Sequence, residues 1–390
     1  MSKWEEVKLG DIAKTQSGGT PSRSKKQYWN GDIPWLKSGE LEDSFNVINN
    51  TEFITELGLK ESSAKLFSKG TLLLAMYGAT AGKLGILGID ACTNQAVCSI
   101  QNNKNLFDEK FVYFFLLLKR EQIIKDSFGG AQPNISKTYI DNIKIPLPPL
   151  PVQKQIVAKL DALFERIDKS ITLLEENIKH TQDLMASVLD EEFNKLYENE
   201  PHEIVDNIVD LQRGHNPPKK DFIYKPKKGY IRFLQIRDGS SDKNAVYVPI
   251  TKKLHLVNED ELLLVAYRHV GKVFRKMSGA FNVALCKLTK KDYSKLDIDY
   301  LYYLVQSKYI KGELLSRSER ALIPSMSVDH LKSLRVPFPS IEKQILIKNK
   351  LEQMEILNKK LLNQLNSKLG HLKSLKSSLL DMAFKGELVE

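Results

Sequence analysis

The 390-residue sequence has few cysteines and no long apolar run. Its three cysteines show no paired spacing, which argues against a disulfide framework and fits a reducing compartment. The longest continuous apolar run covers residues 111–118 and is far too short to span a bilayer. Residues 1–6 have no apolar signal-peptide core. We therefore expect a cytoplasmic protein with no membrane partner.

The sequence also lacks the spacings typical of metal and catalytic sites. Its seven histidines and three cysteines show no zinc-ligand spacing. Residues 78–83 are similar to a phosphate loop, but only three residues separate the glycines, and Leu84 stands where Ser or Thr binds magnesium. The Asn-Pro-Pro segment at 216–218 is followed by Lys219 instead of the aromatic residue of amino-methyltransferase loops. We assign no catalytic or metal-binding residue.

Two long stretches are present that a globular core does not need. Each follows a proline-rich segment, at residues 145–151 and 336–339, and the first then runs without proline or glycine for over forty residues. Apolar residues recur at steps of three and four, which predicts a stripe along a helix roughly 65–70 Å long. The first stripe contains Ile156, Leu160, Leu163, Ile167, Ile171, Leu174, Ile178, Met185 and Val188. The second contains Ile345, Leu351, Met354, Leu361, Leu365, Leu369, Leu372, Leu379 and Met382.

These stripes predict that the two helices pair as an antiparallel coiled coil. Most of the stripe residues are expected to form the core between the helices. Phe193 and Phe384, near the helix ends, are expected to be exposed and to help dock partner subunits.

The net charge of +10 is unevenly distributed. Residues 1–151 carry 18 basic and 16 acidic side chains, a charge of +2, whereas residues 200–340 carry 25 and 16, a charge of +9. The long stretches at 152–199 and 341–390 together carry 15 and 16, a charge of −1. Basic globular parts favour a polyanion such as nucleic acid, although an excess of lysine also serves solubility.

The second half of the sequence repeats the first at an offset of 188–198 residues, which indicates an internal duplication. Matched pairs include Ile12 and Ile208, Gln16 and Gln212, Gly18 and Gly214, Tyr77 and Tyr267, Gly82 and Gly271, Asn94 and Asn282, and Cys98 and Cys286. Residues 154–156 are matched with 343–345, and Leu189 and Phe193 with Leu380 and Phe384. Since Cys98 and Cys286 lie in apolar strands, we expect buried structural thiols.

The duplication predicts an α+β fold with two similar mixed α/β domains, separated by two long helices in an antiparallel coiled coil and related by a pseudo-two-fold repeat. The predicted boundaries are 1–151 and 200–339 for the two domains, 152–199 for the first helix, and 340–390 for the second helix and tail. Loop chemistry differs between the copies, because Gly78-Ala79-Thr80 becomes Arg268-His269-Val270. One scaffold with two loop sets fits a protein that reads two targets, and drift after duplication is the alternative.

The proline-rich segment at 145–149, with residues 153–161 after it, resembles the start of the long helices in specificity subunits of type I restriction–modification systems. Residues 378–388 resemble that family's C-terminal signature, and the resemblance covers essentially the whole chain. It implies a non-catalytic subunit with two target recognition domains, each reading one half of a bipartite duplex DNA site. The helices would set the distance between the half-sites.

The resemblance also implies partners. Two methylation subunits would dock on the helices and use S-adenosylmethionine to methylate adenine, one in each half-site. Restriction subunits, where present, would bring ATP and Mg. No cofactor is implied in this chain itself.

Candidate DNA contacts are the polar and basic residues of the divergent loops. Arg, Gln and Asn can pair with base edges, whereas Lys more often binds phosphate. In the first domain they are Gln16, Ser17, Arg23, Lys25, Lys37, Tyr77, Thr80, Lys83 and Gln132. In the second they are Arg213, His215, Asn216, Lys219, Lys220, Gln235, Arg237, Tyr267, Arg268, His269, Lys272, Arg317 and Arg320.

Two alternatives stay open at this point. In the first, two related domains bind protein partners without sequence-specific DNA binding, and the helices only space them. In the second, the chain is an autonomous nuclease or methyltransferase. The first predicts binding that is insensitive to salt, whereas phosphate contacts predict a steep loss of affinity as salt rises.

Overall fold

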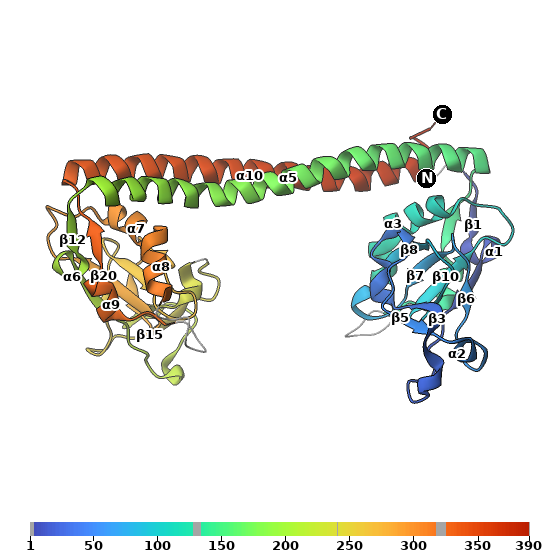
Figure 1. Cartoon of the computed structure of the whole chain (residues 1–390), viewed down its shortest axis with the longest axis horizontal. Helices are drawn as coiled ribbons and strands as arrows, with labels where there is room; N and C mark the ends of the chain where they lie inside the picture. Colours follow the sequence, from blue (N-terminus) through green and yellow to red (C-terminus); the bar gives the residue numbers. More distant parts are fainter. Residues whose placement is uncertain (1–3, 128–133, 240, 317–324, 390) are drawn as a thin grey trace. The chain divides into compact units, whose positions relative to one another are not determined.

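The computed structural model describes residues 4–127, 134–239, 241–316 and 325–389. The chain divides into two compact units. Unit 1 comprises Met1–Leu174 and Lys368–Glu390, and unit 2 comprises Glu175–Ser367. Each unit contains sheets, short helices and part of each long helix, α5 (Leu150–Asn199) and α10 (Ile341–Lys385) (Figure 1). The α+β fold class predicted from the sequence is confirmed.

Unit 1 is built around two sheets. The main sheet has the order β2-β10-β7-β8-β4, and the second has the order β5-β3-β9-β6. A separate pair, β1 and β11, lies where the chain leaves the domain for α5. The strands are β1 Glu6–Lys8, β2 Lys14–Ser17, β3 Trp29–Leu36, β4 Ser44–Val47, β5 Glu52–Ile54, β6 Leu66–Phe67, β7 Leu72–Ala75, β8 Leu84–Leu87, β9 Ala91–Thr93, β10 Val97–Gln101 and β11 Lys144–Pro146. The helices are α1 Leu9–Ile12, η1 Lys26–Tyr28, η2 Ser38–Leu41, α2 Glu56–Lys60, η3 Gly78–Thr80, α3 Glu109–Lys125 and α4 Lys137–Asp141.

Unit 2 repeats this arrangement, except that its main sheet has no counterpart of β4 among the described residues. Its main sheet has the order β13-β20-β17-β18, its second sheet the order β15-β14-β19-β16, and its exit pair is β12 and β21. The strands are β12 His202–Ile204, β13 Val209–Arg213, β14 Tyr230–Leu234, β15 Val246–Pro249, β16 Leu256–Val257, β17 Leu262–Val265, β18 Val273–Phe274, β19 Gly279–Phe281, β20 Leu285–Lys290 and β21 Arg335–Pro337. The helices are α6 Val205–Ile208, η4 Lys219–Asp221, η5 Ile236–Gly239, α7 Ile298–Gln306, α8 Lys308–Ser316 and α9 Val328–Ser333.

The strand pairing shows that the duplication is structural. In each unit the second sheet contains one parallel pair, β3 with β9 and β14 with β19, among antiparallel neighbours. The matched thiols Cys98 and Cys286 lie in β10 and β20 and are fully buried, as predicted. Burial raises the pKa of the Cys98 thiol to about 12 and that of Cys286 to about 11.

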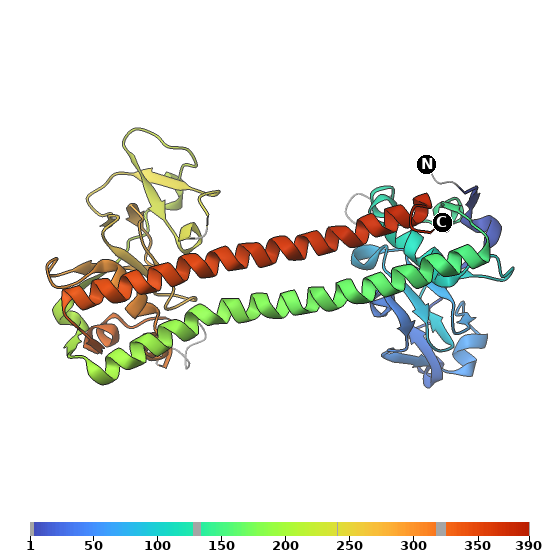
Figure 2. The same cartoon turned by 90° about the horizontal axis from the view of Figure 1, so that it is seen from above.

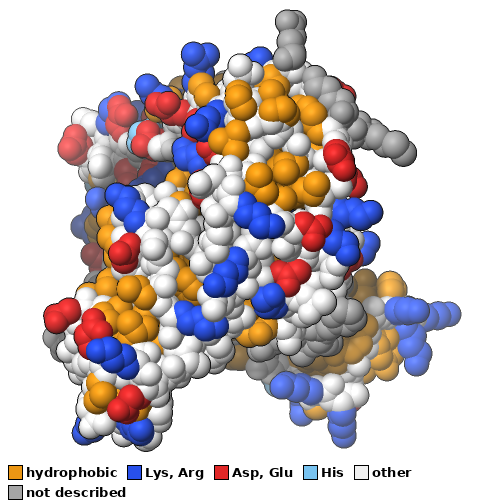
Figure 3. All heavy atoms as spheres, turned by 90° about the vertical axis from the view of Figure 1, so that its right-hand side faces the viewer, with side chains coloured by type: hydrophobic (Ala, Val, Ile, Leu, Met, Phe, Trp, Pro, Cys, Tyr) orange, Lys and Arg blue, Asp and Glu red, His pale blue; other side chains and the backbone are white. Residues whose placement is uncertain are grey.

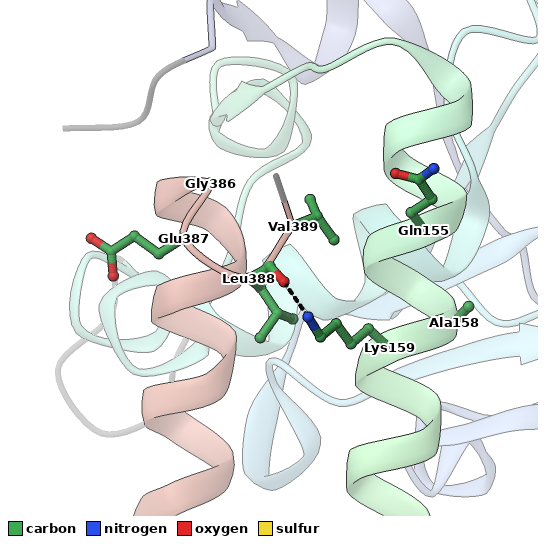
Figure 4. A pocket seen from close by; sticks show the side chains of 7 residues that line it. All are labelled: Gln155, Ala158, Lys159, Gly386, Glu387, Leu388 and Val389. Carbon is green, nitrogen blue, oxygen red and sulfur yellow. Dashed lines mark hydrogen bonds between the residues drawn. The ribbon is translucent and has the colours of Figure 1, made fainter.

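The two long helices run antiparallel within each unit (Figure 2). In unit 1, Lys376 of α10 donates to Asp168 of α5 at 2.7 Å. In unit 2, Lys350 of α10 pairs with Glu192 of α5. Helix α10 ends where Gly386 adopts φ +79, a left-handed conformation that glycine takes without a Cβ penalty. The tail then turns back, and Lys159 of α5 donates to the carbonyl of Leu388 at 2.7 Å (Figure 4).

A buried glutamine at the start of each long helix attaches it to the domain it follows. The side chain of Gln153 accepts from the Asp108 N–H at 2.9 Å and donates to the carbonyl of Pro148 at 2.8 Å. Gln344 accepts from the Asp297 N–H and donates to the Pro339 carbonyl, both at 2.9 Å. Asp108 and Asp297 are in turn the N-caps of α3 and α7.

These contacts correct the sequence alignment of the helices. Gln153 matches Gln344, so the offset here is 191 residues, and the predicted match of residues 154–156 with 343–345 is wrong by two positions. Burial agrees, because Ile347 is 4% exposed and matches the fully buried Ile156, whereas Ile345 is 41% exposed. Three residues assigned to the second stripe, Ile345, Leu361 and Met382, are exposed instead.

The expected exposure of Phe193 and Phe384 is also wrong. Their exposed fractions are 1% and 5%. Phe384 packs on the rings of Phe111 and Phe115 of α3, with centroids 5.0 and 5.2 Å apart, and Phe193 packs on Tyr300 of α7. These phenylalanines bind the helix ends to the cores of their own units and present no surface to a partner.

Candidate nucleic-acid interface

The main sheet of unit 1 brings several predicted DNA contacts to one edge. Because β2, β10 and β7 pair antiparallel, the end of β2 and the end of β7 both meet the start of β10. The N–H of Gly18 donates to the Val97 carbonyl at 3.0 Å, and that of Met76 donates to the Ala96 carbonyl at 2.7 Å. These bonds hold the loops after β2 and β7 on either side of the turn at residues 94–96.

Gln16, Ser17, Tyr77, Thr80 and Lys83 lie at this edge or in the β7–β8 loop beside it. Tyr77 is 39% exposed and forms a bridge with Asn134. Thr80 donates to the Ser38 hydroxyl at 2.8 Å, which brings Lys37 and the end of β3 close to the same loop. Gln132 lies outside the described residues.

Arg23 and Lys25 stand apart from this group; Arg23 has partners in the second sheet, and Lys25 has its partner in η1. The guanidinium of Arg23 lies 3.7 Å from the ring centre of Trp29 and pairs with Glu52, which also pairs with Lys37. Burial alone would raise the pKa of Glu52, but the hydrogen bonds from both cations lower it. Lys25 donates to the Tyr28 hydroxyl at 2.6 Å.

Unit 2 places its predicted contacts at the equivalent edge. The N–H of Gly214 donates to the Leu285 carbonyl at 3.1 Å, and that of Ala266 to the Ala284 carbonyl at 2.8 Å. Tyr267 is 39% exposed and bridges to Ser325, as Tyr77 does to Asn134. The following predicted residues come from the end of β13 and the two loops at this edge: Arg213, His215, Asn216, Tyr267, Arg268, His269 and Lys272.

Not all of these side chains are free to reach DNA. Arg213 donates to the Met326 carbonyl at 2.7 Å, so its guanidinium is held by the protein. Asn216 accepts from the Val283 N–H at 3.2 Å. Arg268 and His269 are exposed, and no hydrogen bond from either side chain is found in the described part of unit 2.

The remaining predicted residues of unit 2 lie around this edge. Gln235 and Arg237 follow β14, whose Leu234 carbonyl accepts from the Asn282 N–H at 3.0 Å in the turn at the edge. Lys219 and Lys220 are exposed in η4, further along the first loop. Arg317 and Arg320 lie outside the described residues.

The turn between the loops carries an exposed polar side chain that is not among the candidate DNA contacts predicted from the sequence. Gln95 lies on the unit 1 turn, where its side chain accepts from Thr20. Its counterpart in unit 2 is Val283, which is 49% exposed. The sequence marks this position, because Gln95 and Val283 differ between two otherwise matched turns.

Two glycines explain why the loops can approach the turn so closely. A Cβ on Gly18 would lie 2.3 Å from the Thr93 carbonyl oxygen, and a Cβ on Gly214 would lie 2.1 Å from that of Asn282. Any larger residue would push each loop away from the sheet edge. This requirement accounts for the matched glycines in the two copies.

The described residues contain no group of three or more His, Cys, Asp or Glu side chains placed to hold a metal ion. No helix in the described ranges is long and apolar enough to cross a membrane. A hollow of about 1040 Å³ lies between the start of α5 and the C-terminal tail, lined by none of the predicted DNA contacts (Figure 4).

Two units with matched sheet edges and divergent loops define a protein with two related but chemically different surfaces. The chain belongs to the family of type I restriction modification DNA specificity domains, whose pattern matches residues 1–180 and 203–369. Its role is therefore sequence-specific DNA recognition within a restriction–modification system, and it is a recognition subunit rather than a catalytic one. The protein-scaffold alternative is not favoured.

Similar proteins include the type I restriction enzyme MjaIX specificity subunit of Methanocaldococcus jannaschii, with 24% identity over 99% of this chain and 93% of that protein. The EcoBI specificity subunit of Escherichia coli is 25% identical over 76% of this chain and 69% of its own length.

Two solved structures share the fold. One, from work on complex assembly and conformational transition of the type I R-M system, has a TM-score of 0.83 and 20% identity, with 98% of each chain covered. The other, the HsdS subunit of Thermoanaerobacter tengcongensis, has a TM-score of 0.62 and 20% identity, covering 98% of this chain and 97% of that one.

Proposed function

We propose that each unit reads one half of a bipartite duplex DNA site through the edge of its main sheet. The observation that carries the proposal is the pairing of a constant framework with variable chemistry at that edge. Matched bonds hold the loops in both units, while Gly78 and Thr80 of unit 1 are replaced by Arg268 and Val270 in unit 2. Different side chains on one geometry are expected to select different bases.

The charge distribution supports tighter binding of DNA phosphate by the second domain than by the first. Residues 200–340 carry +9, whereas residues 1–151 carry +2. The face of unit 1 turned to the viewer in Figure 3 shows acidic and basic side chains interspersed with hydrophobic patches. We therefore expect the second domain to contribute most of the salt dependence of binding.

We further propose that two methylation subunits dock on the long helices. In unit 2 a small apolar hollow of about 120 Å³ lies between α5 and α10 and is lined by Leu184, Leu357 and Leu361, all more than 40% exposed. At the offset of 191 residues, Leu184 matches Leu375 of unit 1, which is 44% exposed. One exposed leucine at matched positions in each unit supports two like docking surfaces.

On this proposal the chain itself holds no cofactor. S-adenosylmethionine belongs to the methylation subunits, and ATP with Mg to restriction subunits where they take part. The complex acts on duplex DNA in the cytoplasm. The functional division is 1–151 and 200–339 for reading DNA, with 152–199 and 340–390 for spacing and assembly.

The test is selection from a random duplex pool by the chain together with its cognate methylation subunit. The expected result is enrichment of two short sequences at a constant separation, with affinity that falls steeply as salt rises. Retention of DNA without any bipartite enrichment would contradict the proposal. The isolated chain, incubated with DNA, magnesium and labelled methyl donor, is expected to give no product.

A further inference from the structure

Unit 1 contains a second hollow, of about 420 Å³, which none of the predicted DNA contacts lines. It lies against α3, α5 and α10, and its volume is in the range of sites that hold a small group. Four aromatic rings form its apolar wall, those of Phe45, Tyr113, Phe114 and Phe164. Phe45 is the exposed member, at 38%, and its ring lies 4.6 Å from that of Tyr113.

Carboxylates surround these rings. Asp161, Glu165 and Asp168 line the hollow from successive turns of α5, and Asp43 lines it from the loop before β4. Asp43 is paired with Arg120, Asp161 with Lys110, and Asp168 with Lys376. Glu165 is exposed and forms no ion pair with any described residue. The site therefore retains one uncompensated negative charge.

The rings already hold cations of the same unit. The ammonium of Lys110 lies 4.5 Å from the ring centre of Phe45, and that of Lys376 lies 4.6 Å from the ring centre of Phe164. Both distances are within the range in which an aromatic face attracts a cation. The walls are thus suited to a positive group, whereas the carboxylates would repel DNA phosphate.

The equivalent place in unit 2 is filled by an arginine of its own chain. The guanidinium of Arg275 lies 4.2 Å from the ring centre of Tyr302, the counterpart of Tyr113. It donates to Asp299 at 2.7 Å and to Glu355, the counterpart of Phe164, at 2.9 Å.

Strand register shows that unit 1 has no arginine at the position of Arg275. Leu74 pairs with Leu84 in unit 1 as Leu264 pairs with Val273 in unit 2, so Ile86 occupies the position of Arg275. In unit 1 the half-exposed ring of Phe45 covers Tyr113 instead, and the hollow remains beside it.

We propose that this hollow, formed by Phe45, Phe164, Asp161, Glu165 and Asp168, receives an arginine side chain from a partner protein. In unit 2 the guanidinium at the equivalent position belongs to Arg275 of the same chain. In unit 1 the guanidinium would come from the partner protein. Charge complementarity selects a basic protein surface, and the inference rests on the proposed function in naming a methylation subunit as its source. The two units thus differ in how they engage their partners.

The hollow is tested directly with a small probe and the full chain. N-acetyl-L-arginine methylamide is titrated by saturation-transfer NMR, with the neutral citrulline analogue as the control ligand. We expect the arginine probe to bind and the citrulline probe not to bind, and we expect Glu165→Gln to weaken the arginine signal. Equal signals from the two probes, or an unchanged signal in Glu165→Gln, would overturn the proposal.

The source of the arginine is tested with the cognate methylation subunit by titration calorimetry. Glu165→Gln is expected to weaken association about three- to tenfold, and Glu165→Arg more, because it places a competing guanidinium beside the hollow. Glu121→Gln on the exposed face of α3 makes the same charge change outside the hollow and is expected to have no effect. Melting temperatures confirm that each variant is folded.

The results of the two experiments distinguish a failure of this inference from a failure of the proposed function. If the unaltered chain does not bind the methylation subunit at all, the proposed partner is wrong, and the probe titration still decides whether the hollow binds arginine. If the unaltered chain and both Glu165 variants bind the subunit equally, the hollow is not part of the interface and the inference fails.

Discussion

Arg268 has a backbone conformation that an arginine rarely adopts. Its φ is +66, and its counterpart Gly78 has φ +69. A left-handed conformation costs a non-glycine residue about 1–2 kcal/mol. Because the other copy has glycine at this position, we expect the arginine side chain to have a role that offsets this cost. This geometry supports Arg268 as a base-reading residue.

Two substitutions distinguish the contribution of the Arg268 side chain from that of its strained backbone. Arg268→Ala is expected to relax recognition of one half-site only, while the strained φ persists. Arg268→Gly is expected to relax the same half-site and to stabilise the fold by up to about 1 kcal/mol. Sequence selection and thermal unfolding provide the measurements. Equal loss at both half-sites would mean that Arg268 is structural or a general phosphate contact.

The cysteines make a second prediction at this scale. Burial raises the pKa of Cys92 and Cys98 to about 12 and that of Cys286 to about 11. Only the thiolate reacts with iodoacetamide, so alkylation of the native chain at pH 8 is expected to be at least about a hundredfold slower than in urea. Rapid labelling of any of the three in the native chain would contradict their burial.

At the scale of elements, the attachment of each long helix depends on one buried glutamine. Gln153→Leu leaves the Asp108 N–H and the Pro148 carbonyl without their partner, which is expected to cost about 1–3 kcal/mol. Gln155→Leu alters an exposed residue two positions away and is expected to change stability by less than about 0.5 kcal/mol. Hydrogen exchange at the start of α3 reports the difference.

The same comparison in α10 tests the corrected register. Ile347→Ala removes buried methyl groups and is expected to cost about 2–5 kcal/mol, whereas Ile345→Ala is expected to be nearly neutral. A larger effect at Ile345 than at Ile347 would restore the alignment predicted from the sequence.

At the scale of the whole molecule, the proposed docking surfaces predict the number of partners. Leu184→Lys and Leu375→Lys each place a charge on one exposed apolar position. Native mass spectrometry is expected to show one methylation subunit in place of two for each single variant and none for the double variant. The exposed Gln182→Lys serves as the control. Retention of two subunits by the double variant would exclude these leucines from the interface.

The proposed role of the helices predicts a change in the DNA site. Deleting residues 171–177 and 366–372 removes seven residues from each helix, or about 10 Å of rise, and keeps the heptad phase. The preferred spacer between half-sites is expected to shorten, with both half-site sequences unchanged. Selection from random duplexes measures both properties. An unchanged spacer would show that helix length does not set it.

Local patterns in the sequence were enough to predict the two long helices, the duplication and the buried thiols. Periodic apolar residues and proline-rich starts act over a few positions, so they can be read along the chain. The positions of the loops that meet at the sheet edge could also be predicted, because the residues that flank these loops match between the two copies.

Only the tertiary structure decided contacts between distant segments. It showed that Phe193 and Phe384 are buried against α7 and α3, because the core of each unit supplies aromatic rings that cover an apolar side chain at the helix end. It paired Arg23 with Glu52 and Arg213 with the Met326 carbonyl, partners that lie 29 and 113 residues away along the chain. Composition and periodicity carry no information about such partners, which depend on how the sheets and helices pack.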